Sequence, residues 1–318
     1  MDAGSVRPTA SSGVPLKTIQ QIDQQVSAAR TELFTPALQQ ISLNPAVADV
    51  PECGDGAGIC VMKGKTTKPE AVVTGDAKPI IKRKLALLFG NDRYLAPIPP
   101  LETPINDVVA IGNVLKERLG YEARIVRNAT REDIVNELNR LVLEADLDDS
   151  VIVMYAGHGY QAEKGGAGYW IPVDASNTEA STWLSNSAIS KFVANIAARQ
   201  VMLISDSCYS GTLAQEQKVR ATETTVFDRD EILSKRSVMV MSSGGNEPVT
   251  DGGHDNHSLF AYHLIRSLGN IQGDLVGADI HERVRAEVVK EYPQDPQYGA
   301  IVTAGHAPGG EYLIEKKQ

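Results

Sequence analysis

A cysteine and a histidine, each placed directly after a short apolar run, have side chains that could act together as nucleophile and base. Cys208 stands in the polar turn that follows the run at 201–204, and His158 lies between two glycines after the run at 151–155. An imidazole can take the proton of a thiol and later protonate a leaving amine, which is the minimal equipment for acyl transfer. The alternative is a buried thiol and a buried histidine that is bonded to a carbonyl group.

Both apolar runs read as strands that are buried on both faces, as in a parallel sheet. The carboxyl ends of parallel strands meet at one edge of the sheet, where the chemistry of such folds gathers. Cys208 follows His158 by 50 residues, which leaves room for one crossover helix between adjacent strands. Because neighbouring strands lie about 4.8 Å apart, we expect the thiol and the imidazole to face one gap.

Strands and helices are expected to alternate from residue 84 onward. Gly120 is expected to end one helix, and Thr130 with Asp133 forms a capping box at the start of the next. This alternation predicts an α/β fold with a mostly parallel central sheet and helices on both faces. Strands are expected at 85–89, 121–127, 150–155, 201–205, 237–242 and 298–302, and helices at 105–119, 130–143, 189–198, 229–234, 259–268 and 277–291.

The first part of the chain, residues 1–81, is predicted to be an N-terminal extension of the domain at 82–318. It begins with a small, polar stretch that we expect to be disordered. An amphipathic helix follows at about 16–34, and a Gly- and Lys-rich linker completes it. The helix is interpreted as packing on the domain, with an oligomerising or inhibitory segment as the alternative. Residues 212–228 have no apolar period and are expected to form an exposed loop.

Composition excludes several classes of function. The net charge of −9 argues against a nucleic-acid partner, because phosphate binding needs a basic surface. No apolar run approaches the ~18–20 residues that cross a bilayer. The first residues lack the layout of a signal peptide, which favours a cytoplasmic protein, or a periplasmic or secreted one if a leader has been removed. Cys53 and Cys60 are interpreted as free thiols, with a disulfide as the alternative.

The motifs around the cysteine and the histidine resemble those of caspase-like cysteine peptidases, closest to bacterial metacaspases and orthocaspases. The resemblance covers about residues 82–305 and implies the caspase-hemoglobinase fold. The animal-caspase signature around the cysteine is absent. The motifs that carry the resemblance are Tyr155-Ala156-Gly157-His158-Gly159, Pro172-Val173-Asp174, Ser205-Asp206-Ser207-Cys208-Tyr209-Ser210-Gly211, Gly90-Asn91, Asn106-Asp107 and the helix at 258–264.

The resemblance implies a role for several of these residues. Cys208 would be the nucleophile and His158 the general base and acid. The backbone N–H groups of Gly159 and Cys208 would form the oxyanion hole. Asp206 matches the acid of the primary specificity pocket, which selects Arg or Lys before the scissile bond; the alternative is an Asp that caps the turn.

Asp92 and Ser242 are further candidates for substrate binding. Related enzymes form as zymogens and are cut in the loop after the cysteine, where Lys218 and Arg220 are the expected self-processing sites. The basic linker at 63–84 is a second candidate.

Metacaspases often need calcium, and Asp174 matches one of its ligands. The acidic pair expected downstream is replaced by Asn186-Ser187-Ala188. Calcium takes several hard oxygen ligands, so we expect no required cofactor, with calcium as the alternative. His254 and His257 lie in one loop, which is interpreted as solvated, with a metal site as the alternative.

The sequence therefore predicts a cysteine endopeptidase that cleaves proteins or peptides after Arg or Lys and processes itself. A monomer is favoured. The alternatives are a caspase-like signalling or binding module and a non-peptidase cysteine acyl hydrolase on the same fold.

Overall fold

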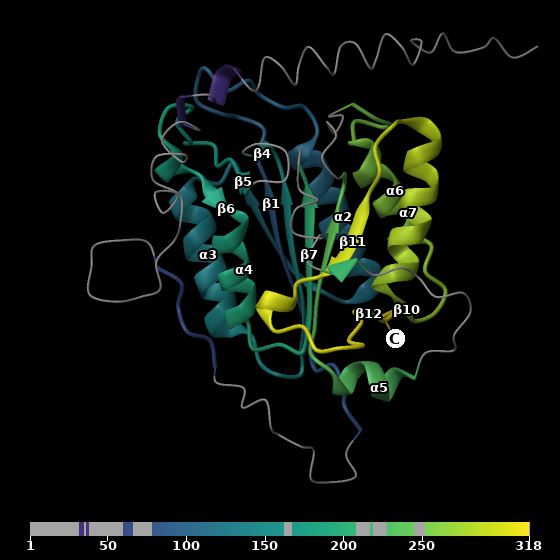
Figure 1. The fold of residues 1–318 in the computed structure, drawn as a ribbon. Helices are drawn as coiled ribbons and strands as arrows, with labels where there is room; N and C mark the ends of the chain where they lie inside the picture. The colour runs from purple at the N-terminus through teal and green to yellow at the C-terminus, as the bar shows by residue number, and fades with distance from the viewer. Residues whose placement is uncertain are drawn as a thin grey trace, which may run out of the picture.

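Seven strands form the central sheet, in the order β2-β1-β3-β7-β9-β11-β8. Figure 1 labels β1, β7 and β11 of this sheet. The structure is a computed structural model that describes residues 32–34, 36–37, 60–65, 78–161, 167–207, 217–218, 228–244 and 252–317. The strands of this sheet are β1 (Arg83–Gly90), β2 (Glu122–Arg127), β3 (Asp149–Ala156), β7 (Gln200–Asp206), β8 (Gln217–Lys218), β9 (Ser237–Ser242) and β11 (Gln297–Ala300).

The central strands pair in parallel, as the alternation predicts. β1 pairs with β2 and β3, β3 with β7, and β7 with β9. All residues of β3 and β7 are buried, which explains why both strands read as continuous apolar runs. β11 runs antiparallel to β9, so the sheet is mixed at this edge.

Helices cover both faces of the sheet (Figure 1). Leu87 and Phe89 of β1 point into the core beneath α3 and α4, and the alternate residues Ala86 and Leu88 point into the core beneath α2, α6 and α7. The helices are α2 (Pro104–Leu119), α3 (Arg131–Glu144), α4 (Asn186–Asn195), α5 (Arg229–Ser234), α6 (Leu259–Gly269) and α7 (Gly277–Glu291).

Most helix ends lie where the capping residues predict them. Gly120 ends α2 in the left-handed conformation at φ 77°, and Thr130 and Asp133 form the expected capping box. The expected start of a helix at 189 is wrong. α4 begins at Asn186, because the Ser185 hydroxyl caps it by accepting a hydrogen bond from the Ala188 N–H group.

Several elements are too short to leave a periodic pattern, and the sequence did not predict them. Three of them, β4, β5 and β6, form a small antiparallel sheet directly after the histidine, and two others, β10 and β12, pair near the C-terminus. These elements are β4 (Gly159–Gln161), β5 (Gly168–Trp170), β6 (Leu184–Ser185), β10 (Leu275–Val276), β12 (Leu313–Ile314) and the 3₁₀ turns at Ala180–Thr182 and Val302–Ala304.

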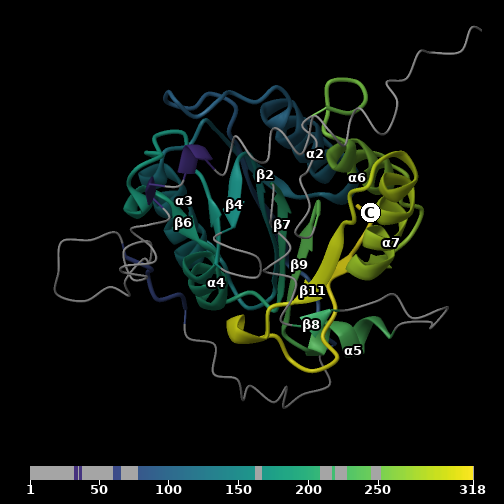
Figure 2. The same cartoon turned by 45° about the horizontal axis from the view of Figure 1, so that its top comes forward.

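The loop expected at 212–228 contains a strand. Gln217 and Lys218 form β8, which pairs antiparallel with Ala300 and Gly299 of β11 at the edge of the sheet (Figure 2). The prediction of a loop is therefore wrong at these two residues. Backbone pairing with β11 needs no apolar side chains, so the polar composition of the segment does not reveal it.

Part of the N-terminal extension packs on the small sheet. Residues 32–34 are helical, and Phe34 is only 2% exposed. Its ring centroid lies 5.3 Å from that of Tyr160 and 5.1 Å from that of Trp183. The expected disordered start and most of the helix expected at 16–34 lie outside the described residues.

A second part of the extension, residues 60–65, packs against α3. The Asn139 side chain donates a hydrogen bond to the Cys60 carbonyl at 2.7 Å and accepts one from the Met62 N–H group at 2.7 Å. Cys60 is disulfide-bonded, so its interpretation as a free thiol is wrong; its partner lies outside the described residues. Where the structure describes helices, none is long and apolar enough to span a membrane.

Candidate active site

The register between β3 and β7 decides where the predicted catalytic residues come from. Ala156 pairs with Asp206, and the Gly157 N–H group donates to the Asp206 carbonyl at 3.2 Å. His158 and Cys208 each follow a residue of this pair by two positions. The two strands are adjacent and parallel, as predicted. Cys208 itself lies outside the described residues, since the description of this turn ends at Ser207.

His158 is held on several sides. Its side-chain Nε2 lies 2.8 Å from the Pro99 carbonyl oxygen, and its backbone N–H group donates to the Tyr94 hydroxyl at 2.8 Å. The rings of Tyr94 and His158 lie 4.6 Å apart. Because a carbonyl oxygen only accepts, Nε2 carries the proton of the neutral imidazole. Nδ1 is then the nitrogen that can accept a proton.

Tyr155 supports the same histidine from the core. Its hydroxyl lies 2.8 Å from the carbonyl oxygens of both His158 and Ile171, and its ring stacks on Trp170 at 4.5 Å. Burial raises the pKa of this hydroxyl well above its ordinary value, so it stays neutral and donates. A side chain at Gly157 would collide with the hydroxyls of Tyr94 and Tyr155, at 2.6 and 2.8 Å from its Cβ. The position therefore needs glycine.

Asp206 lies at the end of β7 and is only 7% exposed. Its Oδ2 atom accepts a hydrogen bond from the Ser258 hydroxyl at 2.5 Å. Next to it, the hydroxyls of Ser205 and Ser207 lie 3.1 Å apart. The predicted specificity acid thus lies in a buried polar environment at the carboxyl edge of the sheet.

Asp92 follows β1 at the same edge. The Asn128 side chain accepts hydrogen bonds from the N–H groups of Asp92 and Arg93 at 2.9 and 3.0 Å, which fixes this turn. Within the described part of the chain, the buried Oδ1 atom of Asp92 has no hydrogen-bond partner. Arg93 Nε approaches it only to 4.0 Å.

The other candidates for oxyanion and substrate binding, Gly159 and Ser242, lie on β4 and β9. Gly159 opens β4, where it pairs with Trp170. Ser242 ends β9 beside Ser205 of β7 and is fully buried. Its hydroxyl donates to the Gly244 carbonyl at 3.0 Å.

The proposed processing sites differ in what the structure describes. The backbone of Lys218 belongs to β8, and Arg220 lies outside the described residues.

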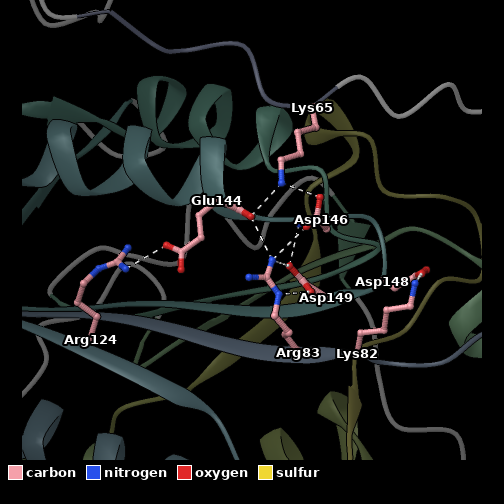
Figure 3. A network of polar contacts seen from close by, with 8 residues as sticks. All are labelled: Lys65, Lys82, Arg83, Arg124, Glu144, Asp146, Asp148 and Asp149. Carbon is pink, nitrogen blue, oxygen red and sulfur yellow. Dashed lines mark hydrogen bonds and ion pairs between the residues drawn. The ribbon is translucent and has the colours of Figure 1, made fainter.

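At the opposite end of the sheet, where β1 and β3 begin, acidic side chains bind basic residues of the segment at 63–84 (Figure 3). Lys65 pairs with Asp146 at 2.7 Å, and Arg83 binds Asp149 at 2.6 Å. Arg83 already belongs to β1, so the linker ends before it.

The predicted calcium ligand has a different partner. Asp174 Oδ1 accepts a hydrogen bond from the Arg131 N–H group at 2.8 Å. Among the residues with described positions, no three or more His, Cys, Asp or Glu are arranged to hold a metal ion. The described residues do not offer the several hard oxygen ligands that calcium takes.

The two loop histidines bind separate carboxylates. His254 Nε2 lies 2.6 Å from Glu291 Oε2, and His263 Nε2 lies 3.0 Å from the other oxygen of the same carboxylate. His257 Nδ1 lies 2.7 Å from Asp107 Oδ1. Residues 252–256 of the loop are exposed, in keeping with a solvated loop, and these contacts tie it to the domain.

Sequence reasoning missed the groups that hold the predicted catalytic and specificity residues. Tyr94 and Pro99 lie in a loop with no motif, and only the fold brings them to His158. Asp107 and Ser258 belong to motifs that were quoted for the resemblance, but no role followed from either.

Known proteins are similar to this chain in sequence and in fold. The Peptidase_C14 family model, described as a caspase domain, matches residues 83–304. The mucosa-associated lymphoid tissue lymphoma translocation protein 1 of Homo sapiens and its homolog of Mus musculus are each 34% identical over 100 residues. That stretch is 31% of this chain but only 12% of either curated relative. The structure of caspase-1 from Spodoptera frugiperda superposes with a TM-score of 0.52 at 12% identity, covering 71% of this chain and 89% of that one.

The likeness to caspase-1 shows the fold, which is the caspase-like α/β fold with a mostly parallel sheet. The family model spans most of the chain and includes both His158 and Cys208. The chain therefore belongs to the caspase-domain peptidase family.

Proposed function

We propose that this protein is a metacaspase-type cysteine endopeptidase that cleaves after Arg or Lys, with Cys208 as nucleophile and His158 as base. One observation carries the proposal. Ala156 pairs with Asp206, two positions before His158 and Cys208, and the bond of His158 Nε2 to the Pro99 carbonyl leaves Nδ1 as the base, which supports the proposal.

The reaction follows from this tautomer. His158 Nδ1 takes the thiol proton of Cys208, and the thiolate attacks the carbonyl carbon of the scissile bond. The N–H groups of Gly159 and Cys208 stabilise the oxyanion. The carbon–nitrogen bond breaks as Nδ1 returns the proton to the leaving amine. Water then hydrolyses the thioester, with His158 again accepting a proton. Throughout, the Nε2–H group keeps its bond to the Pro99 carbonyl.

The preference for basic residues rests on two acids at the same edge. Asp206 is buried next to the turn that holds Cys208, and Asp92 has a buried carboxylate oxygen without a hydrogen-bond partner in the described residues. A buried carboxylate is costly unless a cation or donor satisfies it. An arginine or lysine side chain of the substrate would supply such a partner to Asp92 Oδ1 and would add a charge-assisted bond to Asp206, whose Oδ2 already accepts from Ser258.

Self-processing after Lys218 or Arg220 fits the same specificity. Both are basic residues in the segment that joins the Cys208 turn to the rest of the sheet. The cut would leave His158 and Cys208 on one fragment and β9 and β11 on the other.

Labelling of Cys208 tests the proposal. An arginyl chloromethyl ketone should alkylate the wild-type cysteine, as shown by mass spectrometry of the peptide that contains residue 208, and an aspartyl chloromethyl ketone should not. His158→Ala should lose the labelling, because no base then removes the thiol proton. A wild-type protein that reacts with neither reagent would instead favour a binding module, and reaction with the aspartyl reagent alone would contradict the assignment of Asp206.

A further inference from the structure

Two motifs of the sequence meet at Ser258, whose hydroxyl contacts the carboxylate of Asp206. The pair Asn106-Asp107 opens α2, and Ser258 opens α6, more than a hundred residues later. Neither has a part in the chemistry proposed above. In the structure Ser258 contacts the predicted specificity acid and Asp107 contacts Ser258, which invites a common explanation.

Ser258 makes the direct contact. Its Oγ atom donates to Asp206 Oδ2 at 2.5 Å and accepts a hydrogen bond from the Ala261 N–H group at 3.0 Å, which caps α6. The short distance is in the range of a hydroxyl bonded to an ionised carboxylate. Because the hydroxyl has a single hydrogen, the cap fixes the direction in which it donates.

Asp107 binds the backbone of Ser258. Its carboxylate oxygens accept from the Ser258 N–H group at 3.3 and 3.4 Å, and Oδ1 also lies 2.7 Å from His257 Nδ1. Asp107 is 1% exposed and belongs to α2, which packs against α6. The start of α6 is therefore tied to a helix of the same core.

These contacts suit an acid that must stay ionised and aligned. Burial disfavours the charged form of Asp206, and a hydrogen bond donated to the carboxylate favours it. The N-terminal end of α6 adds the positive end of a helix dipole close to the same group. A fixed Oδ2 also fixes the plane of the carboxylate.

We propose that Ser258, held by Asp107, is the positioning residue that orients the Asp206 carboxylate toward the basic side chain of the substrate. This inference rests on the proposed function and deepens it, because it names what sets the geometry of the specificity acid. Ser258 does not touch the reacting atoms.

The test compares two fluorogenic peptides that differ only in arginine or citrulline before the scissile bond. Citrulline has nearly the shape of arginine without its charge. Ser258→Ala should lower the arginine-to-citrulline ratio of kcat/KM by about tenfold, mainly through KM for the arginine peptide. Ser258→Gly should lower it equally, although glycine preserves a helix cap better than alanine. Ser258→Thr keeps the hydroxyl and should restore the ratio.

A matched control separates positioning from loss of a helix cap. Ser185→Ala removes another buried serine that caps a helix, α4, and should leave the ratio unchanged. Alkylation of Cys208 by iodoacetamide, which needs no specificity pocket, should proceed at the wild-type rate in all Ser258 variants.

The outcomes distinguish this inference from the function beneath it. A wild-type protein without preference for arginine over citrulline would overturn both. A wild-type preference that survives in Ser258→Ala and Ser258→Gly would overturn the inference alone. Equal losses of the ratio in Ser185→Ala, or a matching loss of iodoacetamide reactivity in Ser258→Ala, would show a structural role instead.

Discussion

The free energy of unfolding of this protein is expected to depend on pH through the titration of the Glu311 carboxyl. Replacing Glu311 by glutamine should remove that part of the pH dependence. Glu311 precedes β12, and its Oε1 atom accepts hydrogen bonds from the Tyr298 hydroxyl at 2.5 Å and the Tyr312 N–H group at 2.7 Å. Burial raises the pKa of this carboxyl from 4.5 to about 7, and the charge of Asp279 adds to the rise. The two hydrogen bonds oppose it without cancelling it.

The sign and the size of this pH dependence follow from the linkage between proton binding and folding. Between pH 4.5 and about 7 the folded protein binds a proton that the unfolded chain has lost. The stability that this proton provides is complete below pH 4.5 and is lost as the pH rises through about 7. At about 1.4 kcal/mol per pKa unit the full loss is about 3 kcal/mol, of which about 2.5 kcal/mol falls between about pH 5 and pH 8.

Urea unfolding of wild type and Glu311→Gln at both pH values measures this difference. The glutamine keeps an oxygen that can accept both hydrogen bonds. The variant should gain about 2.5 kcal/mol relative to wild type between about pH 5 and pH 8, or about 5 °C in Tm. Subtracting the two proteins removes the contribution of the histidines, which titrate in both.

The control is Glu287→Gln, at an exposed glutamate whose pKa Lys290 lowers, so that it is ionised at both pH values. The stability of Glu287→Gln should change between the two pH values by as much as that of wild type. If Glu311→Gln also ran parallel, the carboxyl of Glu311 would titrate normally and the reasoning would be wrong.

Three further changes have defined outcomes. Arg220→Gln should reduce self-cleavage, seen by intact mass, more than Lys218→Gln does, because Lys218 is paired with β11 and must first detach; the reverse order would contradict this. Phe34→Ala should raise amide hydrogen exchange of residues 32–37 on the order of 100-fold and Phe34→Leu less, since the ring is buried between Tyr160 and Trp183; unchanged exchange would show that the ring does not hold the segment. Gly157→Ala should lower kcat about 100-fold by displacing the hydroxyls that hold His158, whereas Gly269→Ala, in open space, should not change it. A normal kcat in Gly157→Ala would contradict the need for those hydroxyls.

Much of the fold could be predicted because its central elements are long and buried. β3 and β7 are apolar along most of their length, and the caps at Gly120 and Thr130 mark helix ends by local chemistry. Strands of two or three residues, such as β6 and β8, leave no period. β8 exists because β11 offers an edge to pair with, which depends on residues far along the chain.

The residues of the candidate site also fall into those that could be predicted from the sequence and those that could not. His158 and Asp206 follow predicted strands, so their motifs and spacing were enough to bring them to one edge. Tyr94 and Pro99 act through a hydroxyl and a carbonyl, and any residue with the same backbone could supply the carbonyl. Ser258 reaches Asp206 only because α2 and α6 pack on one face of the sheet.

Peptide cleavage by wild type and Cys208→Ala tests the central claim most directly. Fluorogenic peptides with arginine, lysine or aspartate before the scissile bond are incubated with each protein, with and without calcium. The account predicts that wild type cleaves the arginine and lysine peptides, that it spares the aspartate peptide, and that Cys208→Ala cleaves none. Cleavage of the aspartate peptide alone, or equal cleavage by Cys208→Ala, would contradict it.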